Sequence, residues 1–290
     1  MKNLFLIAVL LLTFSGFASN ANAGTWVTGS VTNSFGSRNY KAWIPANYRA
    51  GRPVPLFLML HGCSQNPDDF AAGTNINPLA DTYNFITVYP EQPSTANGSS
   101  CWNWFLIEHQ TRDSGEPLLI ADIIRQVKSN YSVNNDKVFT LGMSAGAAMS
   151  VIMGATYPDI FAGVGASAGL EFRAGDNAVT AVIAQETMGP DPNMQGQIAF
   201  NSMGTFARRM PTIVFHGTLD QTVRNTNGTQ IIEQYAQTND FIDDGVDNNS
   251  VDAIADQTIL GTVPRSGGLT YTQTIYNDAS GKPLMEKWFV

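Results

Sequence analysis

The chain has 290 residues, with 16 basic and 24 acidic side chains, and its formal net charge at pH 7 is −8. A protein this acidic is poorly suited to bind nucleic acid or an anionic membrane surface, because both repel negative charge. No internal repeat, linker or low-complexity tract divides the sequence. Beyond the N-terminal segment, the chain is long enough for one large α/β domain with a well-buried core.

The N-terminus has the pattern of a secretory signal peptide, which we expect to span residues 1–23. Lys2 precedes an unbroken apolar run from Leu4 to Leu12, and Ala21-Asn22-Ala23 is a small-x-small cleavage signal. The apolar run is too short to span a bilayer. The mature chain is therefore expected to begin near Gly24, and the protein to be secreted to the periplasm or the extracellular space.

The pattern after residue 23 alternates strands with helices. The expected strands cover residues 25–31, 38–44, 54–60, 85–89, 138–141, 163–168 and 212–215, and a closing hairpin covers 269–276 and 283–290. The expected helical stretches are 77–83, the segment opening at Glu116-Pro117, an inserted lid at 171–205, and 226–238. Two irregular stretches are expected at 91–116 and 240–250. This alternation predicts the α/β class, with a mostly parallel central sheet and helices on both faces.

The segment Gly142-Met143-Ser144-Ala145-Gly146 has the pattern of a nucleophile elbow. An apolar strand, Val138 to Leu141, runs into it, and a helix rich in small residues follows. A turn this tight admits only small residues two positions before and after the serine, and it raises the hydroxyl above the sheet edge. The alternative is a Gly/Ala-rich turn between a strand and a core helix. The context favours Ser144 as a catalytic nucleophile.

Two further parts of an ester-hydrolysing site can be placed by chain order. Asp220 follows the strand that ends at Phe215, where an acid that orients a catalytic base belongs. Its alternative is an ordinary solvated loop aspartate. The loop after the strand at 54–60 is expected to form the oxyanion hole, with one donor from the backbone N–H of Cys63, or of Ser64, and the other from that of Ala145.

Cys63 and Cys101 are the two cysteines of the chain. Export to an oxidising compartment predicts a disulfide between them, the alternative being two buried free thiols. Trp102 and Trp104 follow Cys101 directly, and they either pack in the core or line an apolar substrate groove beside the oxyanion loop.

Seven sequence blocks together resemble the polyhydroxybutyrate depolymerase family of esterases, which includes acetylxylan and feruloyl esterases. The blocks are LHGCSQ (60–65), YPEQ (89–92), CWNWF (101–105), GE (115–116), GMSAGAAM (142–149), YPDIF (157–161) and HGTLD (216–220). The resemblance covers roughly residues 36–290 and implies the α/β-hydrolase fold. It maps the family's nucleophile to Ser144, its acid to Asp220, its oxyanion loop to Cys63, and its paired cysteines to Cys63 and Cys101. Ala147 stands where the family usually has glycine.

The family's catalytic histidine departs from this pattern. In the family it lies in a Gly-His-x-Trp block shortly after a strand that resembles residues 285–290. No histidine follows Asp220, and the three present, His61, His109 and His216, do not suit the role. His61 is expected to be structural, His109 precedes the nucleophile, and His216 is too near Asp220 in sequence. We therefore expect a catalytic domain at 24–290 that is truncated near its last strand, the alternative being a natural pseudo-hydrolase.

These observations predict a secreted serine esterase that hydrolyses hydroxyalkanoate polyesters or their oligomers through an acyl-enzyme on Ser144. The alternatives are an acetylxylan or feruloyl esterase, and a non-catalytic binding protein on a hydrolase scaffold. We expect no cofactor and no metal, since the acidic stretch at 243–249 lacks the spacing and the bidentate glutamate of a calcium-binding EF-hand loop. The expected partner is an ester substrate, and neither nucleic acid nor a membrane is expected; the sequence leaves the oligomeric state open.

Overall fold

The computed structural model describes residues 23–264 and 267–290. The predicted signal peptide lies outside these residues, apart from Ala23. The strands are β1 (Thr25–Asn33), β2 (Gly36–Ile44), β3 (Val54–Leu60), β4 (Ile86–Pro90), β5 (Val133–Met143), β6 (Val164–Ser167), β7 (Thr212–His216), β8 (Gln257–Thr262), β9 (Thr270–Asn277) and β10 (Pro283–Phe289). The helices are α1 (Pro67–Thr74), α2 (Asn77–Tyr83), α3 (Gly115–Asn130), α4 (Ala145–Thr156), α5 (Ala178–Glu186), α6 (Pro192–Met203) and α7 (Thr226–Asp244), with 3-10 turns η1 (Ile107–Gln110) and η2 (Gly204–Phe206).

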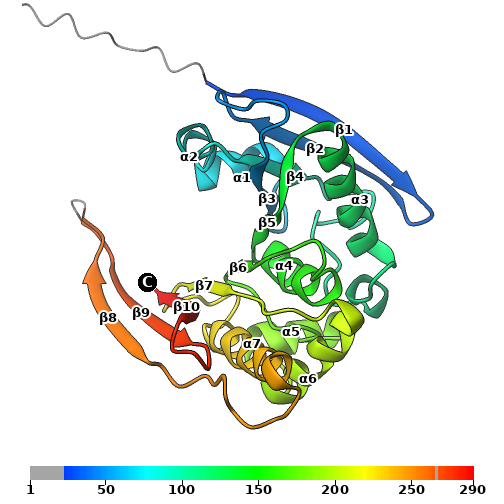
Figure 1. Ribbon diagram of the computed structural model, residues 1–290. Coiled ribbons are helices and arrows are strands. Elements are labelled where there is room, and N and C mark those ends of the chain that lie inside the picture. The colour runs from blue at the N-terminus through cyan, green and yellow to red at the C-terminus, as the bar shows by residue number, and fades with distance from the viewer. Residues whose placement is uncertain (1–22, 265–266) are drawn as a thin grey trace, which may run out of the picture.

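All ten strands form one sheet, in the order β1-β2-β4-β3-β5-β6-β7-β10-β9-β8 (Figure 1). The central strands from β4 to β10 pair in parallel, whereas β1, β2, β9 and β8 pair antiparallel at the two edges. In a parallel sheet the carboxyl ends of the strands lie along one edge. The loops that follow β3, β5, β6 and β7 therefore meet at that edge, where ligand sites of open α/β sheets form.

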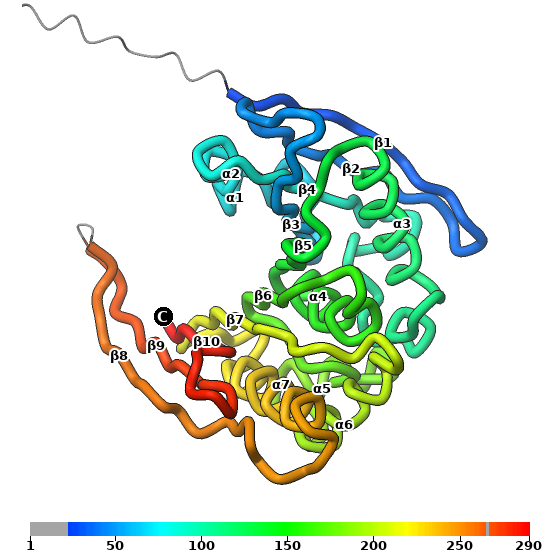
Figure 2. Tube along the Cα trace, in the orientation of Figure 1, coloured from blue at the N-terminus to red at the C-terminus, as the bar shows by residue number. Residues whose placement is uncertain are grey.

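Helices lie on both faces of the sheet, as expected from the sequence. Helices α1 and α2 lie beside β3 and β4 on one face, and α3, α4 and α7 lie on the other, which the tube in Figure 2 also makes visible. Strand β3 divides its side chains between the two: Leu56, Leu58 and Leu60 join the large core under α4, whereas Phe57 and Met59 join a smaller cluster under α1. Such a strand is apolar at every position because both of its faces are buried.

Three elements differ from the expectation. Helix α1 was not predicted; its N-cap is Asn66, whose side chain accepts hydrogen bonds from the N–H groups of Asp68 and Asp69. Strand β8 was also missed, since it pairs at the sheet edge and has mostly exposed residues. The predicted turn at 240–250 is wrong in its first half, because α7 continues to Asp244. The lid at 171–205 is mostly helical, as predicted, through α5 and α6.

None of the helices in the described part of the chain is both long enough and apolar enough to cross a bilayer.

Candidate active site

Ser144 lies in a strained turn between β5 and α4. Its backbone angles are φ 55° and ψ −123°, a conformation that L-residues rarely adopt. The two flanking glycines cannot be replaced without displacing backbone. A Cβ on Gly142 would lie 2.1 Å from the carbonyl oxygen of Gly146, and a Cβ on Gly146 would lie 2.1 Å from that of Leu60. This geometry is the one that the elbow pattern predicts.

Two features hold the Ser144 turn in place. The N–H of Ser144 donates to the carbonyl oxygen of Ser167 at 2.9 Å, which ties the turn to the end of β6. Every residue of α4 is buried, so the helix cannot shift without disturbing the core. The N-terminus of α4 thus points at the serine, and its dipole favours a negative charge there.

The loop after β3 packs against this turn. The close approach of Gly146 to Leu60 and His61 brings the loop and the elbow into backbone contact. The N–H of Ser64 donates to the carbonyl oxygen of Ser99 at 2.7 Å, so it is not free for a substrate. Across residues 23–264 and 267–290, the N–H groups of Cys63 and Ala145 have no hydrogen-bond acceptor. They are therefore the donors that this part of the structure leaves open.

Cys63 and Cys101 form a disulfide, as predicted from the sequence. The bond joins the loop after β3 to the long segment between β4 and α3. Trp102 adds a second link, because its indole Nε1 donates to the carbonyl oxygen of His61 at 3.1 Å. Trp102 and Trp104 are only 0% and 4% exposed. Both lie in the main core, and a role in binding substrate stays a prediction.

His61 has a structural role. Its Nδ1 donates to the carbonyl oxygen of Gly62 at 2.8 Å, and its Nε2 accepts from the N–H of Gln92 at 3.0 Å. An imidazole with one donating and one accepting nitrogen is neutral. Burial lowers the pKa of His61, which agrees with this neutral form.

Glu116 organises the long segment between β4 and α3, a role that the sequence analysis missed. Its carboxylate is fully buried and accepts hydrogen bonds from the backbone N–H and side chain of Asn103 and from the side chain of Gln92. Arg38 of β2 forms a buried ion pair with it at 3.4 Å. The GE block was the available signal, but its partner Arg38 is too distant in sequence to be recognised.

Asp220 lies in the loop after β7. Its Oδ1 accepts hydrogen bonds from the N–H groups of Thr222 and Val223 at 2.8 and 3.0 Å. Its Oδ2 lies 3.6 Å from Nε2 of His216, a contact that the sequence analysis did not anticipate. His216 is buried beside Gly228 of α7, and its Nε2 donates to the carbonyl oxygen of Val223. Burial lowers the pKa of His216, so its ring favours the neutral form.

No histidine of the described segments is hydrogen-bonded to Ser144. His109 is used elsewhere, since its Nδ1 accepts from the N–H of Glu116 at 2.9 Å. The end of β10 lies beside the Asp220 loop. The N–H of Val290 donates to the carbonyl oxygen of His216 at 3.0 Å, and the N–H of Thr218 donates to the carbonyl oxygen of Val290 at 2.8 Å.

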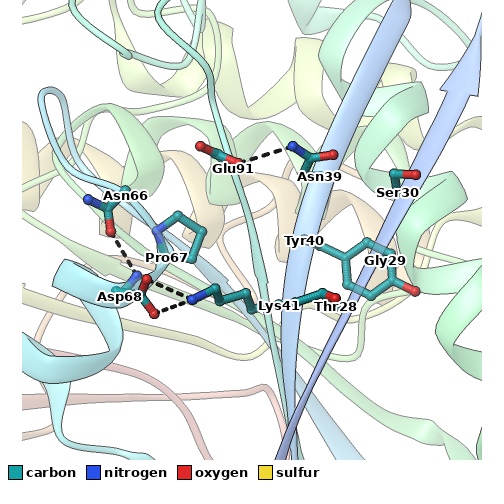
Figure 3. Close-up of a pocket in the computed structure, with 10 residues that line it drawn as sticks. All are labelled: Thr28, Gly29, Ser30, Asn39, Tyr40, Lys41, Asn66, Pro67, Asp68 and Glu91. Atoms are coloured by element: carbon teal, nitrogen blue, oxygen red, sulfur yellow. Dashed lines mark hydrogen bonds and ion pairs between the residues drawn. The ribbon is translucent and has the colours of Figure 1, made fainter.

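A separate polar cavity of about 600 Å³ lies between β1, β2 and the start of α1 (Figure 3). Lys41 extends to Asp68 and contacts both of its carboxylate oxygens at 2.7 Å, and Glu91 accepts from Asn39. Its charged groups are thus already paired, and neither Ser144 nor Asp220 lines it.

The comparisons with known proteins agree with the resemblance predicted from the sequence. The chain is 31% identical over 295 residues to poly(3-hydroxyalkanoate) depolymerase C of Paucimonas lemoignei, covering 100% of this chain and 65% of that protein. It is 28% identical over 218 residues to acetylxylan esterase A of Talaromyces purpureogenus, covering 72% and 56%, and 26% identical over 284 residues to feruloyl esterase B of Neurospora crassa, covering 92% and 89%. The chain thus spans 65% and 56% of the length of the first two relatives.

The solved acetyl xylan esterase from Aspergillus awamori superimposes with a TM-score of 0.72 at 22% identity, covering 91% of this chain and 92% of that one. This likeness and the mostly parallel sheet confirm the predicted α/β-hydrolase fold. Residues 39–253 match the family described as Esterase PHB depolymerase. Because that match covers most of its length, the chain belongs to the Esterase PHB depolymerase family.

Proposed function

We propose that this protein is a carboxylic ester hydrolase that forms an acyl-enzyme on Ser144. The observation that carries the proposal is the strained turn at Ser144, held between two glycines that no larger residue could replace. Strain of this kind is retained where it positions a reacting group. Membership in the Esterase PHB depolymerase family supports the same assignment.

In the proposed reaction, Ser144 Oγ attacks the ester carbonyl, and the developing negative charge on the carbonyl oxygen is stabilised by two backbone donors. The N–H groups of Cys63 and Ala145, which have no acceptor among the described residues, are the best candidates, because the neighbouring N–H of Ser64 is bonded to Ser99. Preorganised donors of this kind each contribute roughly 100- to 1000-fold to the rate. The positive end of α4 adds to this stabilisation.

The serine hydroxyl also requires a base, which Asp220 would orient. This base would take the proton of Ser144 and pass it to the ester oxygen, so that the C–O bond breaks and the alcohol leaves as the acyl-enzyme forms. A water molecule, deprotonated by the same base, would then attack the acyl-enzyme, release the carboxylic acid and regenerate Ser144. The resemblance to the family implies that the imidazole for this purpose belongs to a Gly-His-x-Trp block after the strand equivalent to β10. Two hydrogen bonds join Val290 to His216 and Thr218, immediately before Asp220 in sequence. A block joined to Val290 would therefore begin beside the proposed acid.

For the substrate we propose a hydroxyalkanoate polyester or its oligomers. The relative from Paucimonas lemoignei is a poly(3-hydroxyalkanoate) depolymerase. Helix α5 exposes three apolar side chains, Val179 (69% exposed), Val182 (50%) and Ile183 (55%), and Leu219 (84%) is exposed next to Asp220. Helix α5 contacts the Asp220 loop, since the N–H of Arg224 donates to the carbonyl oxygen of Gln185. Exposed apolar side chains on this helix and this loop suit contact with an apolar polymer surface.

Acetylxylan or feruloyl esterase activity is the second candidate. The alignment with feruloyl esterase B covers 89% of that protein, more than the alignment with the depolymerase. Replacing Val182 and Leu219 by serine separates the two candidates: hydrolysis of a solid polyester should fall while that of a soluble acetyl ester stays unchanged.

We further propose that residues 24–290 belong to one catalytic domain, that it is secreted after cleavage near Ala23, and that Trp102 and Trp104 support the acyl groove.

Covalent labelling tests the nucleophile. A fluorophosphonate should label Ser144, and Ser144→Ala should abolish the label, whereas Ser150→Ala in α4 serves as a control that keeps it. Persistent labelling of Ser144→Ala would rule out the assignment. Absence of labelling in every variant, including the extended chains described next, would favour the non-catalytic binding protein.

The base is tested by joining a Gly-His-x-Trp block to Val290, with a Gly-Ala-x-Trp block as its control. The histidine version should hydrolyse activated esters faster, with a rate governed by an ionisation near pH 6 to 7. Equal rates for the two versions would contradict this place for the base. His109→Ala would then be the next variant to measure.

A further inference from the structure

A cavity of about 410 Å³ lies between the β8–β9 hairpin, the end of β10 and the loop after β7. We call this space the hairpin cavity. The side chains that matter for its chemistry are those of Thr218, Leu260, Thr262, Thr270, Thr272 and Phe289. None of the lining residues in the described part of the chain has a charged side chain. In Figure 1, β9 lies between β8 and β10, beside the marked end of the chain.

The register of the three strands shows which side chains share the face of this cavity. Residues that lie directly opposite each other on neighbouring strands point to the same face of a sheet. Thr272 lies opposite both Leu260 of β8 and Phe289 of β10, so the three form one row. Thr262 and Thr270 lie opposite each other, two positions further along, and form the next row on the same face. Five of the lining side chains are therefore neighbours on one surface.

The residues between them point to the other face. The ring of Tyr271 packs against that of Trp288 at 5.1 Å, and Trp288 does not line the cavity. Phe289 instead packs edge to face against His216, with ring centroids 6.2 Å apart. The surface with the hairpin cavity therefore continues into the segment that leads to Asp220.

The polar groups of this surface are open to a ligand. Thr262 and Thr270 are exposed and Thr272 is half-buried, so their hydroxyls are within reach of a bound molecule. The hydroxyl of Thr218 is engaged, because it donates to the carbonyl oxygen of Val290 at 3.2 Å. Leu260 is 78% exposed. The cavity thus presents three hydroxyl donors beside apolar carbon from the threonine methyl groups, the leucine and the phenylalanine.

This lining selects the chemistry of a ligand. A charged ligand would lose hydration without meeting a side chain of opposite charge. A sugar has many donors and acceptors to satisfy, and the described lining offers no amide or carboxylate side chain to it. A hydroxyalkanoate chain has an ester carbonyl and an alkyl group in each repeat unit, so it accepts hydrogen bonds and donates none. A threonine side chain matches both parts, with its hydroxyl for the carbonyl and its methyl for the alkyl group.

The distance from Ser144 sets the length of such a ligand. In the sheet order, β10 is three strands and β8 five strands away from β5, which leads into Ser144. With a strand spacing of about 4.8 Å, the cavity lies roughly 14 to 24 Å from β5. A substrate that reacts at Ser144 reaches it only when its chain continues for several repeat units.

We propose that the hairpin cavity binds the neutral ester chain of a hydroxyalkanoate oligomer, away from the ester that is cleaved. Carbonyl oxygens of the oligomer accept hydrogen bonds from Thr262, Thr270 and Thr272, and its alkyl groups contact Leu260 and Phe289. The inference rests on the proposed hydrolysis of polyesters and adds to it a place for the rest of the chain.

Isothermal titration calorimetry on the full chain carrying Ser144→Ala tests the proposal, because this background excludes turnover. The probes are a tetramer of 3-hydroxybutyrate capped as acetyl and methyl esters, the capped monomer, and xylotetraose. The tetramer should bind, and the monomer at least tenfold more weakly. Thr270→Val with Thr272→Val keeps β-branched side chains and removes two hydroxyls, so it should weaken tetramer binding at least tenfold. Thr258→Val is the matched control: it is an exposed threonine on the same face of β8 but outside the cavity, so tetramer binding should be unchanged.

A melting curve of each variant establishes that it is folded, and Thr262→Val provides a second variant if the double substitution is not. The proposal is overturned if the tetramer does not bind, if it binds no better than the monomer, or if the folded valine variant binds it as well as its parent does. Stronger binding of xylotetraose than of the tetramer would also overturn it and make the site one for sugars.

Fluorophosphonate labelling of the chain with an intact Ser144 decides the esterase assignment separately. Weaker tetramer binding by the valine variant without any labelling would keep the binding site and refute only the esterase assignment. Labelling of Ser144 together with unchanged tetramer binding by the valine variant would refute only the binding site.

Discussion

Replacing Glu171 by glutamine is expected to stabilise the protein at alkaline pH and to have little effect at pH 5. Glu171 is 1% exposed, and neither of its carboxyl oxygens has a partner within the described residues. Burial, with smaller contributions from Glu233 and Asp191, raises the pKa of Glu171 from 4.5 to about 9. The carboxyl group is therefore protonated in the folded protein at neutral pH, whereas the unfolded chain releases that proton.

The direction of the pH effect follows from this difference. Between the unfolded pKa and the folded pKa, the folded state of Glu171 binds more protons than the unfolded state. Its contribution to stability is thus complete below pH 4.5 and is lost as the pH rises towards 9. Each pH unit in this window lowers the free energy of unfolding by about 1.4 kcal/mol. From pH 5 to pH 8 the loss is on the order of 4 kcal/mol, and glutamine, which does not ionise, avoids it.

Urea unfolding followed by tryptophan fluorescence at pH 5, 6, 7 and 8 measures this difference. The free energies of unfolding of the wild type and Glu171→Gln should diverge steadily with pH, and Glu233→Gln should reduce the divergence by removing a neighbouring charge. Glu186→Gln, at an exposed position of α5, is the control and should parallel the wild type. Parallel curves for the wild type and Glu171→Gln would refute the reasoning.

Three other predictions concern the turn and the loops around Ser144. Gly146→Ala should lower the free energy of unfolding by about 3 kcal/mol or more, because its Cβ would collide with Leu60. The control is Gly73→Ala, where a Cβ meets nothing within 4 Å, and this variant should be neutral or stabilising by up to about 1 kcal/mol. Equal losses of stability for the two variants in urea unfolding would contradict the collision. Replacing both disulfide cysteines by serine should lower the free energy of unfolding by about 4 kcal/mol, as expected for a separation of 38 residues. Urea unfolding of the variant and of the oxidised protein measures the loss, and an unchanged urea midpoint would contradict it. Trp104→Ala should reduce hydrolysis of long hydroxyalkanoate oligomers more than that of a small acetyl ester if Trp104 supports the acyl groove. Equal losses with a lowered melting temperature would instead indicate core packing, as its 4% exposure suggests.

Local patterns predicted the elements that a short stretch of sequence determines. The apolar run before Ser144 and the small residues around it encode a strand, a tight turn and a buried helix, and all three are present. The disulfide was also predictable, because the sequence offers one pairing for its two cysteines.

Elements that depend on distant partners were not predictable in the same way. The carboxylate of Asp240 accepts hydrogen bonds from the N–H of Asn248 and from the side chain of Ser250, so the loop folds back onto α7 and the helix extends beyond the acidic residues that suggested a turn. Strand β8 has little apolar pattern because it lies at an edge. The ion pair of Glu116 with Arg38 joins residues 78 positions apart, which no local pattern encodes.

The disulfide between Cys63 and Cys101 has a consequence for when the proposed enzyme becomes active. Cys63 forms one half of the disulfide. In the proposed mechanism, the backbone N–H of the same residue is one of the two donors to the carbonyl oxygen of the substrate. A newly made chain in a reducing compartment would lack that link, and the donor would be held less rigidly. If the protein is secreted as proposed, its hydrolytic activity would develop together with oxidation of the disulfide, after export. The esters of the producing cell would then be protected while the enzyme is still inside it.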